Sequence, residues 1–326
     1  AHCRVVQGTV REVKAEHTPT YTTAKERQGI QAINVKSCPI CRKKCGTPFV
    51  VYRTFFIFVR KVIYLKKITA DFAVSTTLAT IKNRNNMKRA FVYKDEKSHK
   101  FWWIDYSDCS FAVNYGKYGS IGKFEVKEFD TQEDCQKEAE KLIRSKMKKG
   151  YIEDGNFDFM KRLYIDSDEF GLNPKTSHPR FSEHFSDEIY YSEGDEETPF
   201  GSDEGHDTLI CIFEAIRKNP NLDFSNFPQK LIEQDWDMEY VPITTLDADE
   251  VKKMAADKEM DMIQSDMVTY ATAFAQIKIT GSISFELKER GIKAIKRLAL
   301  IEGMPWNENE IQSKMIEDLQ SFSFIF

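Results

Sequence analysis

The feature that constrains this chain most is a set of three glycines at intervals of three residues, Gly116, Gly119 and Gly122. The segments on either side, residues 110–115 and 124–129, alternate apolar and polar side chains, which is typical of strands with one buried face. Glycine tolerates positive φ and close backbone approach, so the three residues mark a turn. The sequence therefore predicts a tight turn between two strands of one sheet.

More strands are expected before this turn and a helix is expected after it. Residues 90–94 and 100–106 alternate or run apolar, as strands do. Asp130 and Thr131 can cap a helix, and apolar residues then recur at helical spacing until Gly150. The predicted fold class is α+β, with an antiparallel sheet and one packed helix followed by a mostly α-helical domain.

This pattern resembles the WGR domain, named for a Trp-Gly-Arg motif, over residues 87–153. The resemblance is carried by Lys100-Phe-Trp-Trp-Ile, by the residues Asn114 to Gly122, by Lys127-Glu-Phe-Asp130 and by the helix that ends at Gly150-Tyr151. It implies binding to DNA or RNA. In poly(ADP-ribose) polymerases, WGR domains contact DNA and relay the signal to a catalytic domain, and no such catalytic domain is recognisable here.

The name-giving triplet is altered to Tyr115-Gly116-Lys117. Tyrosine offers a smaller stacking surface than tryptophan, and lysine lacks the planar fork of arginine. A basic, aromatic, glycine-rich edge still suits a phosphate backbone and an exposed base. The candidate nucleic-acid-binding residues are Tyr115, Gly116, Lys117, Tyr118 and Lys123. The alternative is that both tyrosines are partly core and that the lysines only solvate the turn.

Trp102 and Trp103 are adjacent on one expected strand, so they point to opposite faces of the sheet. One of them is expected in the core. The other is a candidate surface anchor for a partner.

Charge is distributed unevenly along the chain. Residues 1–86 carry 16 Lys and Arg against 4 Asp and Glu, residues 87–150 carry 14 against 11, and residues 151–326 carry 17 against 36. Such asymmetry suggests segments with different partners or different origins. The acidic last segment argues against its own contact with DNA. A basic protein partner, mimicry of nucleic-acid charge and simple solubility all remain open for it.

Residues 1–86 are predicted to be a poorly ordered basic segment, and one hypothesis is that the native protein starts at Met87. Within this segment Cys38, Cys41 and Cys45 are candidate zinc ligands, because a CxxC pair can direct two thiolates at one tetrahedral ion. A fourth ligand would have to come from a residue near the start of the chain. The three cysteines after residue 45 are scattered, which suits a reducing compartment.

No signal peptide is visible, and charged residues interrupt the most apolar run, residues 49–65. A cytoplasmic protein without a membrane span is therefore expected. Residues 154–176 are predicted as a polar linker, and residues 177–326 as an acidic domain with helices over 208–218, 249–276, 285–301 and about 307–319. This part resembles the C-terminal part of small uncharacterised bacterial proteins that pair a WGR domain with an acidic helical domain.

Three functional hypotheses follow. The first is a non-enzymatic, nucleic-acid-associated adaptor or regulatory protein that binds through the WGR-like module. The second is a metal-dependent enzyme or metal-stabilised module centred on His178, Asp203 and His206, which are metal-compatible residue types without a diagnostic spacing. The third is a protein–protein interaction scaffold. The sequence contains no GxSxG motif, P-loop or dinucleotide fingerprint, so no cofactor is implied.

Overall fold

The computed structural model describes residues 88–166, 171–305 and 307–326. The expectations for residues 1–86, including a zinc site at Cys38, Cys41 and Cys45 and the start at Met87, lie outside these residues.

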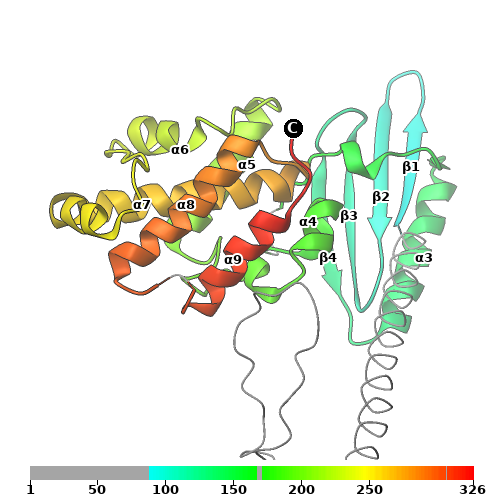
Figure 1. The fold of residues 1–326 in the computed structure, drawn as a ribbon. Coiled ribbons are helices and arrows are strands. Elements are labelled where there is room, and N and C mark those ends of the chain that lie inside the picture. Colours follow the sequence, from blue (N-terminus) through cyan, green and yellow to red (C-terminus); the bar gives the residue numbers. More distant parts are fainter. Residues whose placement is uncertain (1–87, 167–170, 306) are drawn as a thin grey trace, which may run out of the picture. The chain divides into compact units, whose positions relative to one another are not determined.

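The first part of the described chain is an antiparallel sheet with the strand order β4-β3-β2-β1-β5. The strands are β1 (Lys88–Lys94), β2 (His99–Asp105), β3 (Ser110–Lys117), β4 (Lys123–Glu128) and β5 (Ile152–Glu153). Helix α3 (Gln132–Lys148) lies along one face of the sheet (Figure 1). The α+β fold class expected from the sequence is confirmed.

Helix α3 begins and packs as its sequence dictates. The side chain of Thr131 caps it by accepting a hydrogen bond from the backbone N–H of Asp134, and acidic residues occupy its first turn, where they oppose the positive end of the helix dipole. Its buried residues Cys135, Ala139 and Ile143 pack on the sheet. The sheet residues that form this core with them are Phe91, Trp102, Ile104, Phe111 and Val113.

The opposite face of the sheet is also covered. Trp102 is 2% exposed and Trp103 is 1% exposed, so the expectation that one of them anchors a partner at the surface is wrong. Trp103 is enclosed by Phe157, Phe159 and Tyr164, which come from the segment that follows β5. Each tryptophan is buried because each face of the sheet has its own cover, α3 on one side and residues 157–164 on the other.

The rest of the described chain is mostly helical. Its helices are η3 (Phe159–Lys161), η4 (Pro174–Thr176), α4 (Pro179–His184), η5 (Glu188–Tyr191), α5 (Asp203–Lys218), α6 (Phe227–Lys230), the π-helical turn η6 (Leu231–Asp235), α7 (Ala248–Thr280), α8 (Phe285–Glu302) and α9 (Glu310–Ser321). The expected helices correspond to α5, α7, α8 and α9. No helix within the described ranges combines the length and apolarity needed to cross a membrane.

Helix α7 is the centre of this helical part. It packs against α8 and α5, and every residue from Val268 to Ile279 is buried (Figure 1). A helix buried on all sides leaves no wet face for polar residues, so its buried charges need partners. Asp266 pairs with Arg297 of α8 at 2.9 Å, and Lys278 pairs with Asp166 at 2.6 Å.

The end of α7 is bonded to the segment that covers the sheet. The backbone N–H of Tyr164 donates to the carbonyl of Ile279, and that of His178 donates to the carbonyl of Lys278. These bonds satisfy carbonyls that a helix end leaves free. Gly281 closes α7 at φ 71°, and a Cβ there would lie 2.0 Å from the His178 ring. Within the described parts of the expected linker, residues 154–166 and 171–176, Tyr164 and Thr176 are buried, and the backbone N–H of Asp154 also donates to the carbonyl of Ala90 in β1.

Candidate nucleic-acid interface

The residues expected to bind nucleic acid gather at one end of the sheet, where β3 ends and β4 begins. In the strand register Lys117 lies opposite Lys100, and Lys123 lies opposite Tyr115. Tyr115 in turn lies opposite Trp102, whose side chain is on the face covered by α3. Because side chains two residues apart share a face, Lys100, Lys117 and Lys123 belong to this same face.

Helix α3 adds two lysines to this end of the sheet. The ammonium of Lys146 lies 5.2 Å from the ring centroid of Trp102, 5.8 Å from that of Tyr115 and 5.4 Å from that of Tyr151. Such seating over aromatic faces is favourable for a cation. Lys149 lies in the turn that ends the helix. We call the set of Lys100, Lys117, Lys123, Lys146 and Lys149 the basic face.

Lys146 is the electrostatic centre of the basic face. Burial lowers its pKa, and the neighbouring charges of Lys149 and Lys100 lower it further, although Glu125 opposes this effect. Within the described residues no carboxylate pairs with Lys146 at ion-pair distance. A half-buried cation repelled by other cations favours an anionic ligand beside it.

The two tyrosines of the turn have different environments. Tyr115 is half-buried, and its hydroxyl donates to Glu125 Oε1, so the alternative of a partly core position applies to it. Tyr118 is 48% exposed and stacks on His99, with ring centroids 4.1 Å apart and planes within 6°. Tyr118 therefore presents an aromatic face to solvent beside the basic face.

The glycines fix the shape of the turn between β3 and β4. Gly119 and Gly122 have φ values of 85° and 86°, which other residues rarely adopt. A Cβ on Gly122 would lie 2.5 Å from Asn114 Oδ1 and 2.7 Å from the Phe101 ring. The expected requirement for positive φ or close approach is confirmed at Gly119 and Gly122, and Gly122 meets both conditions. Gly116 lies in β3 opposite Phe101, and a Cβ there would lie 2.9 Å from Ser120 Oγ in the turn.

Sequence reasoning missed three members of the basic face, Lys100, Lys146 and Lys149. Lys100 lies in a segment that carries the resemblance, and Lys146 and Lys149 lie at the end of the expected helix, but none of the three is among the expected binding residues. The basic last turn of α3 is a sequence signal for Lys146 and Lys149. Because α3 follows β4 and runs back along the sheet, its last turn lies at the same end of the sheet as the glycine turn.

The residues suggested for a metal site are not brought together. His178 caps α4: its Nδ1 accepts from the N–H of Arg180, and its Nε2 lies 3.0 Å from the Met160 carbonyl. Burial lowers its pKa to about 4. Asp203 instead lines a separate pocket. Within the described ranges, no three His, Cys, Asp or Glu side chains form a group that could hold a metal ion.

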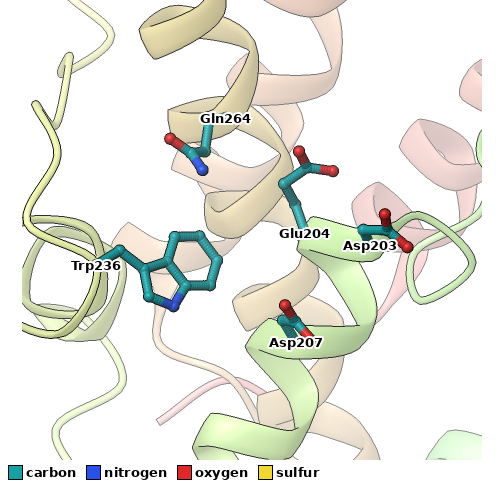
Figure 2. Close-up of a pocket in the computed structure, with 5 residues that line it drawn as sticks. All are labelled: Asp203, Glu204, Asp207, Trp236 and Gln264. Atoms are coloured by element: carbon teal, nitrogen blue, oxygen red, sulfur yellow. The ribbon is translucent and has the colours of Figure 1, made fainter.

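The pocket at Asp203 is about 330 Å³ in volume and lies at the start of α5. Figure 2 shows its lining, which consists of Asp203, Glu204, Asp207, Trp236 and Gln264. The first three are on the first two turns of one helix, and the two in its first turn also oppose the positive end of the helix dipole. His206 is on the same helix but does not line the pocket.

The family model of the WGR domain matches residues 87–158. The sheet, α3 and the glycine turn are thus a WGR domain, a nucleic-acid-binding type of module. The chain is 52% identical over 240 residues to the uncharacterized protein YfeS of Escherichia coli K12, an alignment that covers 72% of this chain and 98% of YfeS. The chain belongs to the family of WGR-domain proteins that includes YfeS.

Two further similarities cover smaller parts. Protein YehF of the same organism is 40% identical over 65 residues, which is 20% of this chain and 24% of YehF. A crystal structure of a protein from Bacteroides fragilis is 30% identical and matches 38% of this chain and 38% of its own, with a TM-score of 0.21.

Proposed function

We propose that this protein is a nucleic-acid-associated adaptor that binds a phosphate backbone through the basic face of its WGR domain. The observation that carries the proposal is Lys146, a half-buried cation on three aromatic rings with like charges around it. An anionic strand beside Lys146 would relieve the repulsion between these lysines. Lys100 and Lys117, on adjacent strands, would then contact phosphates on the same side.

The expected contribution of these lysines is electrostatic. Each phosphate contact that a lysine makes releases condensed counterions, so affinity falls as salt rises. The contact does not depend on the base sequence, because phosphates carry no sequence information. The lysine in the altered triplet retains this charge, although it loses the two-pronged geometry that arginine would provide. Binding is therefore expected to be salt-sensitive and weakly selective for sequence.

Replacing Lys117 by alanine in the full chain is expected to weaken binding to duplex and single-stranded DNA alike. Removing one phosphate contact should also reduce the slope of log affinity against log salt by about 0.9 on duplex DNA and about 0.7 on single strands. The double variant with Lys100→Ala should roughly double both effects. Fluorescence anisotropy of labelled blunt, nicked and single-stranded DNA over a salt series measures them.

The matched control is Lys293→Ala, which removes an exposed lysine of α8 far along the chain from the basic face. It should leave both affinity and salt slope unchanged. If the unmodified protein shows no salt-sensitive binding at low ionic strength, the proposal is rejected. Equal effects of Lys117→Ala and Lys293→Ala would show that binding, if present, does not use the basic face.

The pocket at the start of α5 supports a second role for the helical part, binding of a basic protein segment. Three carboxylates beside one indole suit the side chain of Lys or Arg, which can pair with carboxylates and lie over an aromatic face (Figure 2). Anisotropy of a labelled lysine-rich peptide should report binding that Asp203→Asn with Asp207→Asn weakens. Equal binding of the peptide by the variant and by the unmodified protein would contradict the proposal that this pocket binds a basic segment.

A further inference from the structure

A cavity of about 270 Å³ lies on the other side of the glycine turn from the basic face. Phe101 of its lining lies on the sheet face that residues 157–164 cover, Phe157 comes from that cover, and the remaining lining comes from the turn and from other residues after β5. The lining residues are Phe101, Tyr118, Gly119, Asp154, Asn156, Phe157, Asp158, Lys161 and Arg162. Part of this lining thus comes from outside the strands and helix of the WGR domain.

Arg162 is the unusual group in this cavity. Its guanidinium lies 4.4 Å from the ring centroid of Phe101 and 5.7 Å from that of Phe157. Nη2 donates to the carbonyls of Ser120 and Ile121, whereas Nε is buried and has no hydrogen-bond partner among the described residues. No carboxylate of the described residues forms an ion pair with Arg162, and burial lowers its pKa.

Two carboxylates of the cavity, Asp154 and Asp158, are acceptors, and they lie beside the donors of Asn156 and Lys161. Asp154 Oδ1 accepts from the N–H of Asn156, and within the described part of the chain Oδ2 makes no hydrogen bond. Asp158 accepts from the N–H of Met160 and pairs with Lys161. The cavity therefore combines aromatic rings, an incompletely bonded guanidinium and a carboxylate oxygen that is open to a donor.

We propose that this cavity binds a single unpaired nucleobase of a strand whose phosphates lie on the basic face. The inference rests on the function proposed above. A base matches these lining groups. Its flat ring can lie against Tyr118 or Phe157, its N–H groups can donate to Asp154, and its ring acceptors can accept from Arg162. Among the bases, guanine fits the cavity best, because its adjacent N1–H and N2–H groups can donate to both oxygens of the Asp154 carboxylate.

Two features favour a base over other ligands in this cavity. The lining holds two carboxylates, Asp154 and Asp158, and two cations, Lys161 and Arg162, so its charges balance and it offers both acceptors and donors, as recognition of a neutral base requires. Tyr118 belongs both to the cavity rim and to the turn that directly follows Lys117. A strand held at Lys117 can thus reach the cavity by passing over Tyr118, whereas a base stacked inside a duplex cannot.

The test uses the full chain and short thymine-rich single strands with one central position varied. That position holds guanine, thymine or an abasic residue, and affinities are measured by fluorescence anisotropy. The guanine strand is expected to bind roughly 5- to 100-fold more tightly than the abasic strand, since stacking of one base on an aromatic ring accounts for such a difference. Blunt duplex DNA should not show this gain.

Asp154→Asn is the diagnostic variant, because asparagine retains an oxygen for the Asn156 N–H but presents an amide group in place of the second carboxylate oxygen. It should remove most of the preference for guanine over thymine and leave the affinity for the abasic strand unchanged. Tyr118→Ala should weaken binding of the guanine strand more than that of the abasic strand. Circular dichroism checks that both variants are folded.

The possible outcomes separate the two proposals. If all strands bind with the same salt-sensitive affinity, or if Asp154→Asn changes all of them equally, the base site is rejected and the basic face stands. If neither duplex nor single-stranded DNA binds at low ionic strength, binding through the basic face is rejected, and the base site, which depends on it, is rejected as well. Guanine preference that is unaffected by Asp154→Asn would also overturn the assignment to this cavity.

Discussion

Replacing Arg297 by alanine is expected to lower the free energy of unfolding by about 3–5 kcal/mol, the usual cost of breaking a buried ion pair from one side. Arg297 is 1% exposed, and its Nε donates to Asp266, which is fully buried in α7. Its two other nitrogens donate to the carbonyls of Val241 and Pro242. The alanine variant leaves a carboxylate and two carbonyls buried without these donors.

The measurement is urea unfolding followed by far-ultraviolet circular dichroism. Burial already raises the pKa of Asp266 to about 7, and loss of the guanidinium should raise it further. A group whose pKa is higher in the folded than in the unfolded protein favours folding at low pH. The difference in unfolding free energy between the unmodified protein and Arg297→Ala should therefore become smaller as the pH is lowered from about 8 to about 6.

A double variant, Arg297→Met with Asp266→Leu, is the matched control. It removes both charges and should be much more stable than Arg297→Ala alone, because no unpaired charge remains buried. A single variant as stable as the unmodified protein would contradict the role assigned to this pair. So would a double variant that is no more stable than the single one.

The second large effect concerns His178. Titration of its ring should change the free energy of unfolding by up to about 3 kcal/mol between acidic and neutral pH. Its pKa is about 4 in the folded protein, against a reference value of 6.5, because burial disfavours the charged ring. The folded state therefore resists a proton that the unfolded state accepts. The contribution is fully present above about pH 6.5 and is lost as pH falls toward 4.

His178→Asn isolates this contribution from those of other titrating groups. Asparagine can still cap α4 by accepting from the N–H of Arg180, but it cannot titrate and it loses the contact with Met160. The variant should be less stable than the unmodified protein at neutral pH, and the difference should narrow as pH falls. Unfolding free energies measured side by side at several pH values give this difference. A difference independent of pH would show that His178 does not titrate on unfolding.

Local features of the WGR domain were predictable from the sequence because each depends on a few neighbouring residues. Alternation identifies β3 and β4, Thr131 caps α3, and Gly122 marks a position where a side chain would collide with Phe101. The same holds for α7 and α8, whose boundary at Gly281 follows from the need for a left-handed residue at the helix end.

Features that depend on contacts between distant segments were not predictable in this way. The cover over Trp103 comes from residues 157–164, a polar-looking stretch whose few aromatic residues give no periodic signal. The position of Lys146 depends on three rings from different segments: Trp102 of β2, Tyr115 of β3 and Tyr151, the residue before β5. The sequence makes His178 a candidate ligand because it does not show that the N–H of Arg180 and the Met160 carbonyl already occupy both ring nitrogens.

The bonds of Arg162 to the glycine turn have a consequence for signal transmission. Arg162 holds the carbonyls of Ser120 and Ile121 from behind, and two residues later Tyr164 is bonded to the end of α7. A strand that immobilises the turn would thus also restrain the first residues leading into the helices. Occupancy at the sheet would then appear as slower hydrogen exchange of the Tyr164 amide, which donates to the Ile279 carbonyl, at a distance from any phosphate.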